Sequence, residues 1–186
     1  MALNTRANAA AETNQTLRIP LTQARNADGT AISAAASAGK FGMASGGVGV
    51  GGFRLEGEAA NNNTKTSTLL LCYAVPQNFN TSGTKALEVL ISHKLSAVAA
   101  TTATVDVEAY KSDKAGGVSG SDLCTTAAQA HNSGSLSDLA FTIDPSTLSP
   151  GDELIILVTS VVNDAGGAGS PKAYIGGLAA RATTRM

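Results

Sequence analysis

Residues 138–164 hold two stretches of strong β character joined by a turn, and they constrain the fold more than any other segment. In the first stretch, Phe141 and Ile143 alternate with polar residues, which predicts a strand with one buried face. A proline then ends that strand, and the Pro-Gly pair at residues 150–151 predicts a tight turn. Residues 154–162 are almost entirely apolar and largely β-branched, which predicts a central strand buried on much of both faces. We expect the two strands to form a hairpin.

Similar patterns along the chain predict eight to ten strands and no long helix. Further strands are expected at residues 16–25, 64–75, 86–99, 101–113 and 171–183. Residues 86–99 also fit a helix, and we favour a strand because the flanking segments are strands. Pro20 confines the first strand to a sheet edge or a bulge. Residues 31–39 and 123–131 fit either a strand or a short helix.

These strands predict an all-β protein, an antiparallel β-sandwich. A jelly roll is favoured over an immunoglobulin-like sandwich, because the chain has no Trp for the core position that immunoglobulin domains use. The 186 residues are enough for one such domain, expected over residues 16–186. Residues 1–15 are polar and without period, which predicts an extended arm that is flexible or ordered only by a partner.

The composition indicates which classes of partner the protein is suited to bind. Charged residues make up 15% of the chain, and small residues take their place. Small side chains lose little entropy on burial, which suits dense subunit packing, although a β-protein with many turns has the same composition. The net charge of −1, without a basic block, predicts no direct nucleic-acid binding. No segment is apolar enough to be a membrane span or a signal peptide, so we expect synthesis in the host cytoplasm.

The cysteines and histidines do not form a recognisable reactive motif. Cys72 and Cys124 are expected to be buried free thiols rather than a disulfide. His93 and His131 are not at the spacing of zinc ligands, and neither is next to a nucleophile motif. Both histidines are therefore interpreted as residues without a catalytic role.

Two acidic segments and one glycine-rich segment are candidate sites for a sugar, calcium or phosphate, and each matches the pattern of such a site only in part. Asp106 and Glu108 share one face of a predicted strand, but the chain has few aromatic residues to line a sugar cleft. The loop at residues 113–122 has carboxylates that suit calcium, without the EF-hand spacing. Within the glycine-rich residues 42–52, residues 47–52 partly resemble a phosphate-binding loop, but residues 53–56 predict a strand where such a loop needs a helix. We assign no catalytic, cofactor-binding or metal-binding residue and expect no enzyme.

Three segments are similar to a known class of protein. They are TATVDVEAYKSD (residues 102–113), GSDLCTTAAQ (residues 120–129) and FTIDPSTLSPGDELIILVTSVVNDAG (residues 141–166). Together they resemble the small jelly-roll virion proteins of tailed bacteriophages that decorate the capsid or form head fibres. The resemblance covers about the C-terminal half of the chain. It implies a homo-oligomer, with a trimer favoured, bound to the major capsid protein or another virion protein. It also implies that the N-terminal arm is an anchor.

These features predict a non-enzymatic structural protein of the virion that binds and stabilises a capsid lattice. The first alternative is a subunit of a tail, fibre or filament. The second is a carbohydrate-binding or adhesive β-sandwich module, which the shortage of aromatic residues disfavours.

Overall fold

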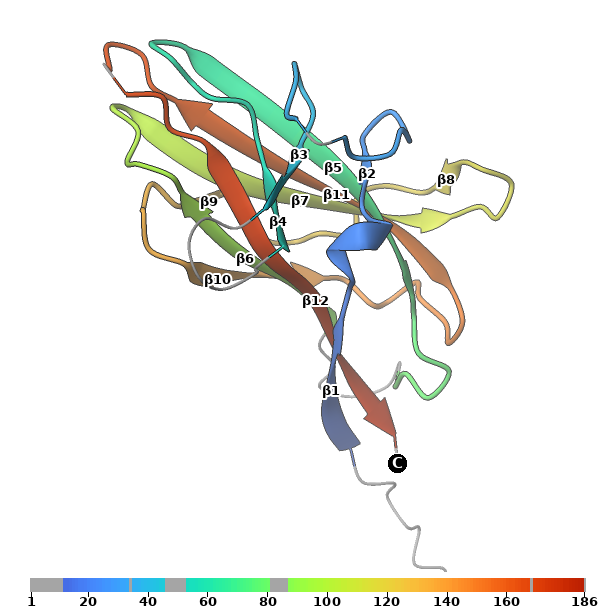
Figure 1. Cartoon of the computed structure of the whole chain (residues 1–186). Coiled ribbons are helices and arrows are strands. Elements are labelled where there is room, and N and C mark those ends of the chain that lie inside the picture. The colour runs from blue at the N-terminus through green and yellow to red at the C-terminus, as the bar shows by residue number, and fades with distance from the viewer. Residues whose placement is uncertain (1–11, 34, 46–52, 81–86, 168, 186) are drawn as a thin grey trace, which may run out of the picture.

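The computed structural model describes residues 12–33, 35–45, 53–80, 87–167 and 169–185 (Figure 1). The strands in these residues are β1 (Glu12–Arg18), β2 (Arg25–Asn26), β3 (Gly42–Ser45), β4 (Phe53–Glu56), β5 (Thr64–Ala74), β6 (Leu87–Leu95), β7 (Thr102–Ser112), β8 (Val118–Ser119), β9 (Gln129–Ala130), β10 (Ser137–Ile143), β11 (Glu153–Asn163) and β12 (Ala173–Arg185). One 3-10 turn, η1 (Leu21–Gln23), follows β1. Among the described residues, no helix is long and apolar enough to cross a membrane.

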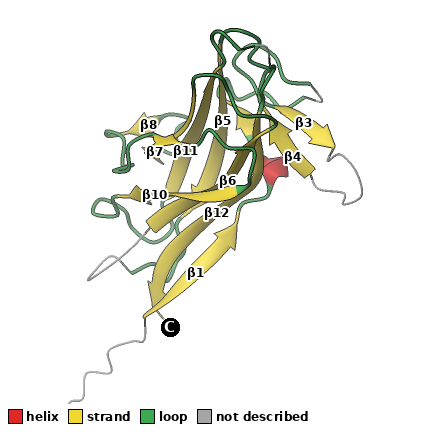
Figure 2. Ribbon diagram, turned by 90° about the vertical axis from the view of Figure 1, so that its left-hand side faces the viewer, coloured by secondary structure: helices red, strands yellow, loops and turns green. Residues whose placement is uncertain are grey.

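The strands form two sheets that pack face to face (Figures 1 and 2). Sheet A has the order β10-β6-β12-β4-β3, with β1 also paired to β12. Sheet B has the order β2-β5-β11-β7-β8, with β9 also paired to β7. Every pairing between these strands is antiparallel. The predicted antiparallel β-sandwich is confirmed.

The connections also follow the jelly-roll pattern. From β4 to β7, successive strands alternate between the two sheets, and β10, β11 and β12 alternate again. The resulting order places β4-β12-β6-β10 opposite β5-β11-β7, with β8 and β9 together taking the outermost position. This is the arrangement of two interleaved Greek keys that defines a jelly roll.

The predicted hairpin at residues 138–164 is wrong in its pairing. Both strands exist, but β10 pairs with β6 in sheet A, whereas β11 lies between β5 and β7 in sheet B. The expected turn does form, with Gly151 at φ +81° and the Asp152 N–H donating to the Ser149 carbonyl. However, the connection crosses between the sheets and buries Leu148 on the way. Local alternation specifies a strand and its faces, but not the neighbour that it pairs with.

β11 is central, as predicted, but it is not buried on both faces. Its inward side chains, including Ile156 and Val158, are fully buried, while the alternating outward ones, including Ile155 and Leu157, are half-buried. The reason is that sheet A covers only the inner face of sheet B. Apolar residues on the outer face of β11 made the run look like a strand enclosed on both sides.

The predicted first strand at residues 16–25 is wrong beyond residue 18: β1 ends there, η1 follows, and Arg25 belongs to β2 in sheet B. The other predicted strands are confirmed with shifted ends. β6 alternates strictly between buried and half-buried residues, so the helix alternative for residues 86–99 is excluded. β1 has β12 as its strand partner and ends before Pro20, in agreement with an edge position. The boundary expected at residue 15 lies within β1, and residues 1–11 lie outside the described residues. Residues 31–39 form only isolated bridges, and the 123–131 segment contributes the short β9.

Replacing Ile156 with Asp tests the position of β11. Ile156 is fully buried between the sheets, so an unpaired carboxylate there should lower the free energy of unfolding by on the order of 4 kcal/mol. Ile155→Asp on the same strand points outward and should cost roughly 1 kcal/mol. Urea unfolding followed by circular dichroism measures both variants. Equal losses for the two variants would contradict the assigned faces of β11.

Candidate functional site

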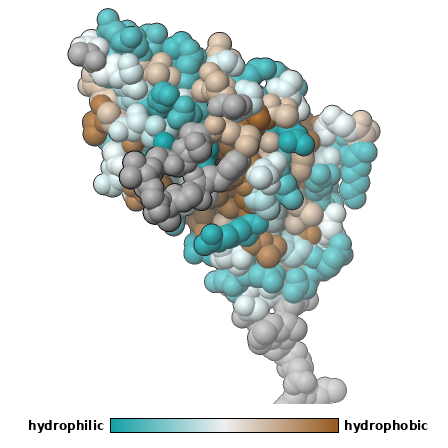
Figure 3. Space-filling view, viewed as in Figure 1, coloured by the Kyte–Doolittle hydropathy of each residue, from teal (hydrophilic) through white to brown (hydrophobic). Residues whose placement is uncertain are grey.

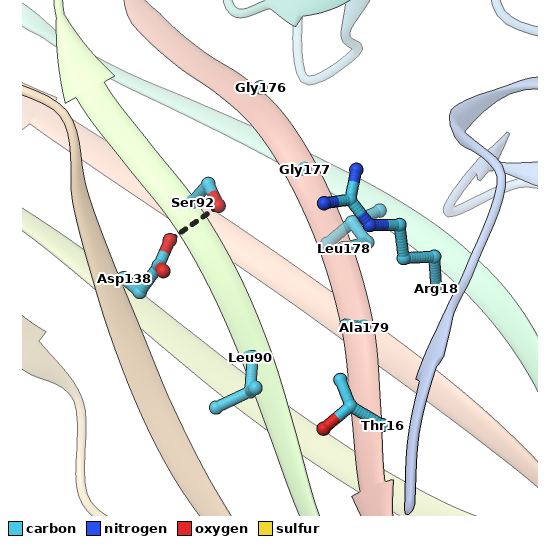
Figure 4. A pocket seen from close by; sticks show the side chains of 9 residues that line it. All are labelled: Thr16, Arg18, Leu90, Ser92, Asp138, Gly176, Gly177, Leu178 and Ala179. Atoms are coloured by element: carbon cyan, nitrogen blue, oxygen red, sulfur yellow. Dashed lines mark hydrogen bonds between the residues drawn. The ribbon is translucent and has the colours of Figure 1, made fainter.

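The outer face of sheet A has a shallow hollow of about 250 Å³. It lies where β10, β6, β12 and β1 run side by side (Figure 4). Figure 3 shows the molecule from the side of Figure 1, with hydrophilic residues toward both ends and more hydrophobic ones between them. The hollow is built from strands alone, so its shape is set by the sheet.

Small residues of β12 form the floor of the hollow. Gly176 and Gly177 lie at an irregularity in the pairing of β12 with β6, where the register shifts between Ile175 and Gly177. A Cβ atom at Gly177 would lie 3.1 Å from the Ser92 Oγ, closer than most such contacts. Ala179 continues the floor toward β1. The absence of larger side chains at these positions keeps the floor low.

Polar side chains stand on two sides of the floor. On one side, Ser92 Oγ of β6 donates a hydrogen bond to Asp138 Oδ1 of β10. On the other side, β1 supplies Thr16 and Arg18, and the Arg18 guanidinium extends over β12 beside Gly177 (Figure 4). The hollow therefore places a carboxylate and a cation on opposite sides of a flat floor. It can hydrogen-bond a small polar group, and no aromatic ring is among its lining residues.

A second polar cluster lies between the sheets. His93 of β6 is fully buried, and its Nδ1 lies 2.8 Å from the Nδ1 of His131, which follows β9. The His93 Nε2 lies 3.4 Å from the Oγ of Ser160 on β11. This contact joins sheet A to sheet B through the core. The two histidines are 38 positions apart in the sequence, and no local pattern indicated that they meet.

The contact between the two histidines constrains their protonation. One ring nitrogen must donate and the other accept, so the hydrogen bond requires at least one neutral imidazole. Burial, followed by the neighbouring His131, lowers the pKa of His93 from 6.5 to about 4. Ser160 resembles a nucleophile beside a histidine, but it is 1% exposed inside the sandwich. The geometry supports a role in packing, and a substrate would have to part the sheets to reach the hydroxyl.

The two cysteines are free, as expected, but their predicted burial is wrong for Cys72. Cys72 is exposed on the outer face of sheet B, because β5 alternates and this position points outward. Cys124 is half-buried beside β10. Partial burial, followed by the nearby Glu153 carboxylate, raises the pKa of the Cys72 thiol. Partial burial also raises the pKa of the Cys124 thiol. Both thiols are therefore protonated and weakly nucleophilic at neutral pH.

The acidic residues of the 113–122 loop hold backbone groups. Asp113 Oδ1 accepts hydrogen bonds from the N–H groups of Ala115 and Gly117, both at 2.8 Å. These donors hold the pKa of Asp113 below its usual value. Asp122 Oδ1 likewise accepts from the N–H groups of Ala109 and Cys124. The Asp113 contacts shape the turn between β7 and β8, and the Asp122 contacts join the segment after β8 to β7. In the part of the chain that the structure describes, no group of three His, Cys, Asp or Glu side chains could hold a metal ion.

The remaining candidates lie on strands. Asp106 and Glu108 point to the outer face of sheet B, on the shared face that the alternation predicts. In the glycine-rich segment, residues 42–45 form β3, which pairs with β4, and residues 46–52 lie outside the described residues. β4 confirms that a strand follows this segment, so it lacks the helix that a phosphate-binding loop requires.

Comparison with known proteins identifies no family. No protein-family model and no curated protein matches the sequence. Solved structures match only in fold. One is a carbohydrate-binding module of the β-sandwich superfamily, with a TM-score of 0.42 and 10% identity over 91% of this chain and 56% of that one. A second is infectious bursal disease virus, strain Gx, with a TM-score of 0.36 and 10% identity over 100% of this chain and 45% of that one.

A third match is a mannan-recognising carbohydrate-binding module, TmCBM27, with a TM-score of 0.35 and 10% identity over 95% of this chain and 97% of that one. The chain thus spans about half the length of the first and second of these structures. At these low scores the likeness supports no functional argument.

Stability should depend on pH through His93. Its pKa is lower in the folded protein than in the unfolded chain, so it stabilises the fold above pH 6.5, and this contribution is lost as the pH falls toward 4. Between pH 6.5 and 4.5 the free energy of unfolding should fall by about 2 kcal/mol from this residue. Urea titrations at both pH values measure the change. In His93→Gln the change should shrink, and an unaltered pH dependence would contradict the assignment.

Proposed function

We propose that the protein is a non-enzymatic structural component of a virion, which binds and stabilises a capsid lattice. The observation that carries this proposal is β1, which runs with the end of β12 as a ribbon projecting from the sandwich (Figures 1 and 2). From Asn14 to Arg18 the side chains on both faces of β1 are exposed. A strand ordered with so little burial gains little in an isolated domain, whereas a partner that covers it would stabilise it.

The outer face of sheet B supports the same proposal. Leu70 and Leu157 lie opposite one another there, and Ile155 lies opposite Cys72, all with partial exposure. These side chains form an apolar patch in the middle of a sheet. Such patches suit contact with neighbouring subunits, where the binding energy is spread over many small contacts.

In this role the protein forms a homo-oligomer, with a trimer favoured, on the major capsid protein or another virion protein. Its net charge of −1 fits contact with protein rather than with nucleic acid. A tail, fibre or filament subunit would use the same projecting ribbon. Such a subunit would assemble into an open helical polymer, whereas a decoration protein forms a closed oligomer on a capsid.

Binding to particles tests the proposal. Fluorescently labelled protein is mixed with particles assembled from the same genome without this gene, and bound protein is separated by sedimentation. We expect saturable binding, and electron microscopy should show added density at regular lattice positions. A helical polymer of the purified protein would favour the fibre alternative. No binding and no polymer at micromolar concentration would contradict both structural roles.

Carbohydrate binding is the second candidate, because the hollow on sheet A offers Arg18, Ser92 and Asp138 as hydrogen-bonding groups around a flat floor. Gly176→Leu should fill the hollow without strain, since a Cβ there meets only Leu136 at 3.8 Å. If glycans bind in this hollow, the variant should weaken binding roughly tenfold or more, because ligand hydrogen bonds are lost. A glycan array and calorimetry compare the two proteins. Glycan binding that is equal in both, or absent from both, would exclude the hollow as a sugar site.

A further inference from the structure

We propose that the free edge of β1 pairs antiparallel with β1 of a second copy of the chain, and that this pairing forms a twofold dimer contact. The inference rests on the proposed structural role, because it names the first partner surface that such a role needs. The proposed contact uses the backbone groups of β1, whereas the hollow on sheet A uses the side chains of Thr16 and Arg18.

The hydrogen bonds to β12 show which backbone groups of β1 remain free. The Ile19 N–H donates to the Leu178 carbonyl at 2.9 Å, and the register of β1 on β12 continues directly from this pair. In an antiparallel ladder, alternate residues face the partner strand. Every second residue back from Ile19 therefore faces β12. The N–H and C=O groups of Asn14, Thr16 and Arg18 face the opposite way, and no described residue pairs with them.

Two other long strands at the margins of the described sheets, β10 and β7, have partners along their outer edges. On the outer edge of β10, the Thr142 carbonyl accepts a hydrogen bond from the Thr125 N–H, and the Ala140 carbonyl accepts one from the Gln129 side chain. The outer edge of β7 pairs with β8 at one end and β9 at the other. Proteins cover or charge their edges because open ones associate with other strands. β1 is an edge of seven residues that no described strand covers, and it carries charge only at its first and last positions.

The sequence of β1 suits pairing with itself. From residue 13 to residue 17 it is uncharged and without proline, so nothing on the edge repels an approaching strand. A twofold axis would satisfy the free edges of both copies with a single contact. β1 also projects from the sandwich, which leaves room for a second copy to approach (Figure 2). A foreign strand or residues 1–11 of the same chain would satisfy only one edge.

One register satisfies the free groups best. With Thr16 opposite Thr16 of the second copy, Asn14 lies opposite Arg18 of that copy, and all the outward groups of Asn14, Thr16 and Arg18 are hydrogen-bonded. In this register Leu17 and Leu17 of the second copy are diagonal neighbours on the other face of the ribbon. Leu17 is 39% exposed in the single chain, and the contact would cover it. If other surfaces form a trimer, the same contact would join two trimers.

A proline substitution tests the contact. Thr16→Pro removes an N–H that does not face β12, so the fold should persist, as circular dichroism can verify. The dimer should dissociate roughly 30-fold more readily, because two intermolecular hydrogen bonds are lost. Thr16→Val keeps the N–H and is the matched control, with unchanged association. Analytical ultracentrifugation and native mass spectrometry measure both variants.

Cysteine crosslinking tests the register. In a Cys72→Ser, Cys124→Ser background, Thr16→Cys places two thiols at the twofold axis, with Cα atoms about 5.5 Å apart, within the range for a disulfide. Asn14→Cys is the control, because its two copies would lie roughly 13 Å apart along the paired strands. Mild oxidation should crosslink the first variant and not the second.

A wild-type chain that is monomeric at tens of micromolar, or present only in odd copy numbers, overturns the inference. So does a dimer that Thr16→Pro leaves intact, or one that crosslinks equally at both cysteine positions. These measurements use the free protein, so their outcome does not depend on whether the protein binds particles. A monomer that still binds particles overturns the β1 contact alone, whereas a β1 dimer that binds none contradicts the virion role alone.

Discussion

The structure depends on apolar packing between the inner faces of two sheets. β6 and β11 alternate along their whole length, and the inward residues of β5, β6, β7, β11 and β12 meet in one core with almost no exposure. Burial at about 25 cal/mol per Å² makes this packing the main stabilising term. β11 lies inside sheet B and β12 lies inside sheet A, each between two neighbouring strands. Their inner faces are used by the core, so only the outer faces and the ends of the sheets are open to partners.

That packing accommodates a polar contact between the sheets, in which the fully buried His93 meets the half-buried His131 and reaches Ser160 across the sandwich. A buried polar group is tolerated when its partners are in place, and here each partner comes from a different part of the chain. The outer faces carry softer features: a hollow with a glycine floor on sheet A and a half-buried apolar patch on sheet B. The ribbon of β1 and the end of β12, with the free edge of β1, is the third such feature.

Much of the fold was predictable because β patterns are local. The alternation at β7, the strand at β6, the edge position signalled by Pro20 and the strand after the glycine-rich segment all follow from residue types and spacing. The errors also have local causes. Apolar residues on the outer face of β11 suggested burial on both sides, and the turn at residues 149–152 suggested a hairpin. The candidate site was not predictable, since its glycine floor, Ser92, Asp138 and Arg18 come from four strands far apart in sequence.

The sequence by itself determined that the chain is all-β, where most of its strands lie and which residues of each strand share a face. These properties depend on the two-residue period and on turn chemistry, which act over a few positions. Only the tertiary structure decided which strands pair, that the chain between β10 and β11 crosses from one sheet to the other, and that His93 meets His131. It also decided that β1 keeps a free edge. Strand pairing depends on contacts between segments that are distant in the sequence, and a local residue pattern does not specify which segments bury one another.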